Sequence, residues 1–523
     1  MKILSFNFKK LQFTPNPLAL WLFFRALSFI YFIAFFSLSF QILGLVGEGG
    51  ILPASPFLHY VQDQIGWRRF FLVPTLFWFI PPTDPILYAG TFLGMFLAIL
   101  LFFNIAPALV SLFLWSLYLS YVTVGQTFFN FQWDGLLLEC GLLSMLSSPW
   151  KLHPGFMKLT FPPSWATFIF RWLLFRLMLL SGIVKLESHD PTWRALTALK
   201  YHYETEPLPT PLAWYFYHFP MWFHETTTFI VLFIELVVPF AIFLGRLGRT
   251  VSFILFSLLQ LLIILTGNHA FFNWIALVLG FVLLEDSFLK KILPFFAKSP
   301  PMPCPKLQKK LSFFLILPVF LISVLLFLES FSFPYPQWTV KLLSSFSALR
   351  SINNYGAFAI MTTRRPEIII EGSTDGIEWK EYPFCWKPDD PHKAPVFISP
   401  FHPRLDWQMW FAALSTPKEN PWFASLLSCL LHGKKEVIKL FQANPFPFSP
   451  PKYVRALIYV YEYSSWSEKK EKGLWWNRTL YGLYFPPASL MITPQNQETR
   501  GIPPSFQWQL TSSPCLKAGD SWR

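Results

Sequence analysis

The chain has 523 residues, of which 53% are hydrophobic and only 14% are charged. Soluble globular proteins carry about 25% charged residues, so this composition excludes an ordinary soluble protein. The net charge of +13 does not indicate nucleic-acid binding, because the basic residues lie mostly in short loops beside apolar runs, as they do in membrane proteins. The five cysteines are too scattered to predict a disulfide framework or a zinc site.

A bilayer core about 30 Å thick requires about 20 apolar residues per helix. Eight runs meet this requirement, and a ninth run, at 131–148, is weaker because it contains two acidic residues. With nine spans, the N-terminal lysines, the basic turn at 245–249 and the lysine-rich segment at 290–310 all face the cytoplasm. We therefore expect a multi-pass α-helical membrane domain of about nine spans over residues 1–331. The expected spans are 18–45, 86–103, 107–124, 131–148, 164–183, 226–244, 251–266, 269–284 and 311–328.

The composition changes after Glu329, where short strand-like runs alternate with Pro, Gly and Asp turns. Residues 367–372 and 377–382 predict a β-hairpin whose turn contains Asp375-Gly376, a pair suited to the positive φ angles of such turns. Helices are expected at 404–414 and 422–431, and strands at 454–463 and 474–484. Residues 332–523 are thus expected to form a separate β-rich domain outside the membrane, a β-sandwich or jelly roll with helical insertions.

Four charged residues lie inside two consecutive expected spans, where charges are costly and usually paired. Asp134 and Glu139 are five residues apart, as are Arg171 and Arg176 on the next span. Counted from the cytoplasmic ends of the two helices, Glu139 and Arg171 lie at similar depths in the membrane, as do Asp134 and Arg176. We therefore predict two ion pairs between the helices, Glu139–Arg171 and Asp134–Arg176. A structural clamp is the preferred interpretation, and a transport path is the alternative. Glu235 has no evident partner.

The outer loop from 187 to 225 is rich in histidine, tyrosine and acidic residues. Such residues can bind a metal ion, but the spacing of His202 and His218 matches no compact metal signature. We therefore expect no metal and no cofactor, and a loop held at the membrane surface by its aromatic side chains. The chain contains none of the sequence motifs of the common enzyme classes.

Several strings resemble the lipase maturation factor family. They lie at 131–139, 176–186, 193–207, 354–356, 361–367, 371–376 and 403–414, and the resemblance extends from about residue 18 to about residue 485. One departure is Glu206, where the family pattern has Gln. The candidate client-binding or structural residues in these strings are Trp193, Tyr201, His202, Thr205, Tyr355, Gly356, Met361, Arg365, Glu367, Gly372, Asp375, Gly376, Arg404, Asp406, Trp407 and Trp410.

The resemblance implies a membrane-embedded factor that helps secreted proteins, by family lipases, to fold and assemble into active dimers, and that is not an enzyme. Its partners would be these client proteins and the lipid bilayer. In a eukaryote the chain would lie in the endoplasmic reticulum membrane with its C-terminal domain in the lumen. In a bacterium it would lie in the cytoplasmic membrane with that domain in the periplasm.

A weaker resemblance supplies an alternative function. Residues 181–186, followed by a tryptophan, are similar to the membrane domain of vitamin K-dependent γ-carboxylase, in which a lysine acts as the base. Only Lys185 corresponds, and a desolvated lysine can serve as a base. The preferred interpretation is a lysine whose amine reaches the membrane interface.

An aromatic face is expected on the helix at 404–414. Trp407, Trp410 and Phe411 are spaced i, i+3, i+4 and so lie on one side. A folding factor requires exposed apolar surface for its clients, but the preferred interpretation is that this face belongs to the core of the domain.

Overall fold

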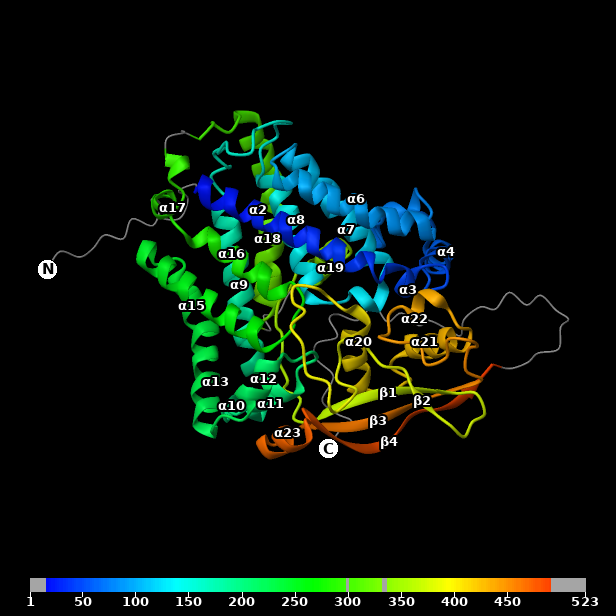
Figure 1. Ribbon diagram of the computed structural model, residues 1–523. Helices are drawn as coiled ribbons and strands as arrows, with labels where there is room; N and C mark the ends of the chain where they lie inside the picture. The colour runs from blue at the N-terminus through cyan, green and yellow to red at the C-terminus, as the bar shows by residue number, and fades with distance from the viewer. Residues whose placement is uncertain (1–15, 298–300, 332–335, 491–523) are drawn as a thin grey trace.

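A computed structural model describes residues 16–297, 301–331 and 336–490. Long helices form the upper part of the molecule, and a four-stranded sheet lies at its lower end (Figure 1). The membrane part contains α2 Pro17–Ser39, α3 Ile42–Val46, α4 Ala54–Ile65, α5 Arg69–Leu72, α6 Asp84–Phe102, α7 Pro107–Val124, α8 Gln132–Ser147, α9 Ala166–Glu187, α10 Pro191–Arg194, α11 Ala198–Thr205, α12 Pro211–Tyr217, α13 Met221–Leu236, α14 Val238–Ala241, α15 Gly245–Thr266, α16 Phe272–Gly280, α17 Asp286–Ile292 and α18 Lys306–Glu329. The C-terminal part contains α19 Gln337–Ser347, β1 Arg365–Ser373, β2 Lys380–Glu381, α20 Arg404–Ala413, α21 Pro421–Leu431, α22 Lys435–Ile438, β3 Tyr453–Tyr463, α23 Trp466–Lys472 and β4 Trp476–Ser489.

Among the described residues, six helices are long and apolar enough to cross a bilayer: α2, α6, α7, α9, α15 and α18. A seventh span results if residues 272–283 and α17, which meet at an angle of 106°, are counted as one broken span. Two of the nine expected spans fall short by this measure, because α8 and α13 have 16 residues each. At about 1.5 Å per residue they are shorter than a typical bilayer core. The count by length and composition is therefore six or seven rather than nine.

The C-terminal strands form one antiparallel sheet in the order β2-β1-β3-β4. This confirms the expected hairpin, in which Gly376 adopts a φ of +82° that favours glycine. Both predicted helices and both later strands are also present, as α20, α21, β3 and β4. The predicted sandwich is not formed by the described residues, because helices rather than a second sheet cover the buried face: α20 packs on β1 and α21 on β3.

The C-terminal domain shares its core with the membrane helices. One cluster of buried apolar side chains includes Phe23 of α2 and Leu136 of α8 together with Ile368 of β1 and Leu405 of α20. Figure 1 shows α20 between the sheet and the helices above it. The domain is thus docked against the membrane part, although the sequence predicts a separate unit. The four cysteines that the structure describes are unpaired thiols.

Candidate functional site

Buried charged side chains join the C-terminal domain to the membrane helices at three places. We call them the Glu139 junction, the Asp134 junction and the Arg365 junction, after a residue of each. Burying a charge is costly unless a partner and hydrogen bonds compensate it, so each junction depends on its full set of contacts.

At the Glu139 junction, α8 and α9 hold a loop of the C-terminal domain. Arg176 forms a salt bridge with Glu139, and both side chains are 1% exposed. The Tyr355 hydroxyl donates to the other Glu139 oxygen at 2.5 Å, and the backbone N–H of Asn353 donates to the same oxygen. Gly356 packs so closely on Val184 that an added Cβ would lie 2.8 Å from a methyl carbon. The family string at 354–356 therefore packs directly against the membrane helices.

At the Asp134 junction, Arg404 extends from α20 into the membrane domain. Its two terminal nitrogens donate to the two Asp134 oxygens at 2.9 and 2.8 Å, the bidentate geometry that suits a guanidinium. Tyr118 donates to the same carboxylate, and the guanidinium lies 3.5 Å from the centre of the Phe129 ring. Both charged side chains of this junction are buried.

These contacts correct the predicted ion pairs. Arg176 pairs with Glu139 rather than with Asp134, whose partner is Arg404 of the C-terminal domain. Arg171 pairs with neither acid and donates to the Val282 carbonyl instead. The prediction placed each acid opposite an arginine of the next helix by depth alone, and it did not consider that a distant domain would supply one of the partners.

At the Arg365 junction, β1 begins beside the outer loop of the membrane domain. The Arg365 guanidinium donates to the backbone carbonyls of Glu204, Glu206 and Pro207. It also forms a salt bridge with Glu367 at 2.7 Å, and Lys387 pairs with the other Glu367 oxygen at 2.9 Å. Arg365 and Glu367 of the 361–367 string therefore fix the C-terminal domain to the string at 193–207.

Further hydrogen bonds join the same region of the membrane domain to the C-terminal domain. Thr205 donates to the Thr362 carbonyl at 2.9 Å, and the Trp410 indole donates to the Thr205 carbonyl at 2.8 Å. The backbone N–H of Met361 donates to Asp190 at 3.0 Å. Nearby, Trp193, Met361 and the partly buried Tyr201 pack in one apolar cluster.

The aromatic face of α20 is mostly internal. Trp407 and Trp410 are 3% and 8% exposed, and Trp407 lies edge-on to Trp133 of the membrane domain. Phe411, the third member, is 41% exposed. This face therefore serves mainly as contact area between the two domains.

Lys185 does not reach the membrane interface. Its side chain is 7% exposed and forms a salt bridge with Glu235, the acid for which the sequence offered no partner. The amine donates to both Glu235 oxygens and to the Ser181 carbonyl, three acceptors for the three donors of an ammonium group. The interpretation of an interfacial lysine is therefore wrong, because the buried acid draws the amine inward.

The remaining candidates shape the C-terminal domain. Asp406 accepts hydrogen bonds from the backbone of Trp386 and Lys387, and its burial raises its pKa to about 6. Asp375 caps the β1–β2 turn, and the backbone N–H groups of residues 377 and 378 lower its pKa. A Cβ on Gly372 would lie 2.6 Å from the Phe446 ring, so only glycine fits there. These residues support the fold, and a role in client binding stays a prediction.

Three side chains that could hold a metal ion meet beside the Arg365 junction, in which Arg365 donates to the Glu206 carbonyl. The Nε2 atoms of His202 and His269 each lie 3.7 Å from Oε2 of Glu206, and the three ligand atoms lie within 4.8 Å of one another. We call this group the His202 cluster. The sequence predicted no metal site here, because the spacing of His202 and His218 matches no metal signature, and the His218 ring hydrogen-bonds to the Trp214 carbonyl. The connection between α15 and α16 supplies His269 to the cluster instead.

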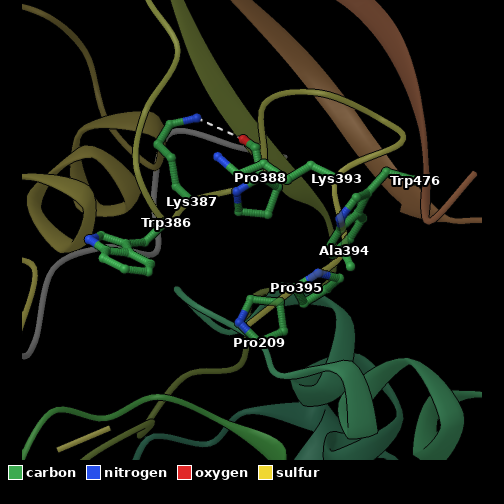
Figure 2. A pocket seen from close by; sticks show the side chains of 8 residues that line it. All are labelled: Pro209, Trp386, Lys387, Pro388, Lys393, Ala394, Pro395 and Trp476. Atoms are coloured by element: carbon green, nitrogen blue, oxygen red, sulfur yellow. Dashed lines mark hydrogen bonds between the residues drawn. The ribbon is translucent and has the colours of Figure 1, made fainter. Parts of the chain in front are cut away.

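A small pocket lies between the two domains near this place. Figure 2 shows Pro209 of the membrane domain facing Lys387, Pro388 and Pro395, with Trp476 at one side. The pocket encloses about 10 Å³, room for about one water molecule. It is too small to admit a lipid chain or a peptide.

Several residues of the junctions were missed from the sequence. Asp190 and Tyr118 accept hydrogen bonds from the Met361 N–H and the Arg404 guanidinium across the two domains, and the Asn353 N–H donates to Glu139. Asp190 precedes a proline and caps α10, a pattern that could have indicated a structural role. Nothing in the local sequence distinguishes Tyr118 from the other aromatic residues of α7.

The fold and the junctions define a polytopic membrane protein with a small α+β domain docked at one end of its helices. The lipase maturation factor transmembrane domain profile matches residues 18–291, and the lipase maturation factor C-terminal domain profile matches residues 351–486. The chain is 34% identical to lipase maturation factor 1 of Mus musculus, over 94% of this chain and 89% of that protein. It is 36% identical to lipase maturation factor 1 of Homo sapiens, over 89% and 87%, and 36% identical to lipase maturation factor 2 of Rattus norvegicus, over 90% and 83%. The chain belongs to the lipase maturation factor family. No solved structure matches it significantly.

Proposed function

We propose that this chain is a maturation factor for secreted lipases, embedded in the endoplasmic reticulum membrane. The observation that carries the proposal is the identity of 34–36% to lipase maturation factors 1 and 2 over about nine tenths of the chain. The match covers both the membrane domain and the C-terminal domain, so the proposal does not depend on one domain alone. The alternative, a carboxylase-like enzyme, receives no support from Lys185, whose donors all have acceptors.

The topology we propose has nine crossings, with the C-terminal domain in the lumen. The short helix α8 begins beside Trp407 of the C-terminal domain and ends where Gln308 of α18 donates to the Ser148 carbonyl. The first half of α13 lies beside α11, where the Leu199 N–H donates to Thr228, and α13 leads to α14, whose Val238 carbonyl accepts from Ser252 in the first half of α15. Both therefore connect the two ends of the bundle. A protease-protection assay on microsomes tests this, because a cut in the β1–β2 turn from the cytoplasmic side would contradict it.

The surface on which we propose that clients bind is the outer edge of β4. Within the described residues this strand has a partner on one side only, and Leu480 and Leu483 are 56% and 53% exposed. A long exposed edge with apolar side chains can accept another strand, and an incompletely folded client offers such strands.

The test is rescue of lipase secretion. Cells that lack their own lipase maturation factors would express a secreted lipase with or without this chain, and lipase activity per secreted lipase molecule would be measured. We expect activity to rise only when the chain is present, while a secreted protein that is not a lipase is unchanged. Equal specific activity with and without the chain would contradict the proposal.

A further inference from the structure

We propose that His202, Glu206 and His269 form a binding site for a divalent transition-metal ion, zinc in the first place. Two imidazoles and one carboxylate are a common set of protein ligands for zinc, with a fourth position left to water. The two histidines come from different segments, α11 and the connection between α15 and α16. A bound ion would tie these two segments of the membrane domain together.

The geometry fits such an ion. Two ligand atoms that bind one zinc ion at about 2.1 Å in a tetrahedral arrangement lie about 3.4 Å apart. Both imidazole nitrogens lie 3.7 Å from the same Glu206 oxygen, within a few tenths of an ångström of that spacing, and all three ligand atoms lie within 4.8 Å of one another. His202 is the most exposed member, with 11% of its side chain accessible, and this is the side on which a water ligand could enter.

Glu206 is the strongest evidence for a ligand. Its side chain is fully buried, and within the described residues neither carboxylate oxygen has a hydrogen-bond donor. Arg365 is near, but its terminal nitrogens are directed to backbone carbonyls and to Glu367. A buried carboxylate without donors requires a cation or a proton. Two imidazoles directed at the same oxygen suit a cation.

The backbone at Gly267 leaves room for the Glu206 carboxylate and the His269 ring. A Cβ added to Gly267 would lie 2.0 Å from the Glu206 oxygen and 2.6 Å from the His269 ring. Gly267 has an extended backbone, with φ of −142° and ψ of 153°, which any residue can adopt. Glycine is therefore required there for space and not for conformation.

The protonation states agree with metal binding by the histidines. Burial lowers the pKa of His202 to about 3 and that of His269 to about 4, so both imidazoles are neutral at physiological pH. A neutral imidazole is the form that binds metal ions.

The experiment uses the full-length protein purified in detergent, freed of metal with a chelator and dialysed against zinc, with magnesium as a comparison. We expect about one zinc per chain by elemental analysis and a cobalt complex with the absorption of tetrahedral coordination. Glu206→Gln and Gly267→Ala should each weaken zinc binding at least about 10-fold, because one removes the charge and the other fills the space. His224→Gln, which changes a buried histidine outside the cluster, should bind zinc as the wild type does.

Two results would overturn the proposal. The first is a wild-type protein that retains no stoichiometric zinc and gives no tetrahedral cobalt spectrum, which would leave a protonated Glu206 as the occupant. The second is a folded Glu206→Gln protein, eluting as a single species, that binds zinc with wild-type affinity. If that variant does not fold, the cobalt spectrum of the wild type decides the question alone.

Discussion

The two sides of the C-terminal domain differ in what they bury and expose. Toward the membrane helices it buries charge: Arg365 and Arg404 are 0% and 1% exposed. At its outer strand it exposes apolar side chains, among them Leu480 and Leu483. Both arrangements cost free energy in isolation. The buried charges fix the orientation of the domain, because only one docked position satisfies them, whereas the exposed strand leaves a surface open to a partner.

The largest loss of stability is expected from Arg404→Ala, which leaves Asp134 charged and unpaired in the interior. Breaking a buried pair in this way costs about 3–5 kcal/mol. Thermal unfolding in detergent would measure the loss. Arg455→Ala removes a partly exposed pair with Glu371 within the C-terminal sheet, and about 1 kcal/mol or less is expected there.

The double variant Asp134→Ala, Arg404→Ala tests whether the two groups act as one unit. The second substitution should cost much less than it does alone, because no unpaired charge remains. Strictly additive losses would show that the junction owes its stability to packing rather than to the pair.

A smaller, pH-dependent effect is expected from Asp406. Its pKa is about 6 in the folded protein and about 4 when unfolded, so the folded state holds the proton more tightly. The stability that Asp406 contributes is present below pH 4 and is lost as the pH rises through 6. The wild type should lose up to about 3 kcal/mol relative to Asp406→Asn between pH 4 and pH 7.

Unfolding of both proteins at a series of pH values would measure this difference. The asparagine keeps the oxygen that accepts from Trp386 and Lys387, so the comparison isolates the charge. A constant difference across the range would contradict the assignment of the titration to Asp406.

Gly356→Ala at the Glu139 junction is expected to destabilise the protein by overpacking. The added Cβ meets Val184, and overpacking of this kind costs about 1–3 kcal/mol. Adding Val184→Ala removes the methyl groups that it meets and should restore most of the stability. If the double variant is no more stable than the single one, the contact is not the cause.

The smallest effect on stability, and the largest on function, is expected from Leu480→Ser with Leu483→Ser. Both side chains are more than half exposed, so unfolding should change by no more than about 0.5 kcal/mol. Lipase activity per secreted molecule should fall toward the level without the chain. A photo-crosslinker at position 480 should capture the lipase, whereas one at the exposed Lys470 of α23 should not. Wild-type rescue by the serine variant would exclude this strand as the client surface.

Elements with a local cause were predictable from the sequence. The hairpin follows from Asp375-Gly376, and α20 and α21 from their apolar periodicity. The single sheet was not predictable, because an alternating strand shows that one face is buried but not whether a helix or another strand covers it. The lengths of two predicted spans could not be read from the sequence either. The runs that form α8 and α13 are apolar, but each helix ends where a loop begins, after 16 residues.

The sequence by itself determined that this is a multi-pass membrane protein of the lipase maturation factor family, because composition and motif strings are properties of the chain alone. It also singled out charged and aromatic residues as structural candidates, but it did not show that they join the two domains. The tertiary structure decided which partner each one takes. Asp134 binds an arginine 270 positions away, Lys185 binds Glu235, and Glu206 meets His269. Charge pairing depends on distance in space, and no spacing within one helix or between neighbouring helices encodes the approach of a distant segment.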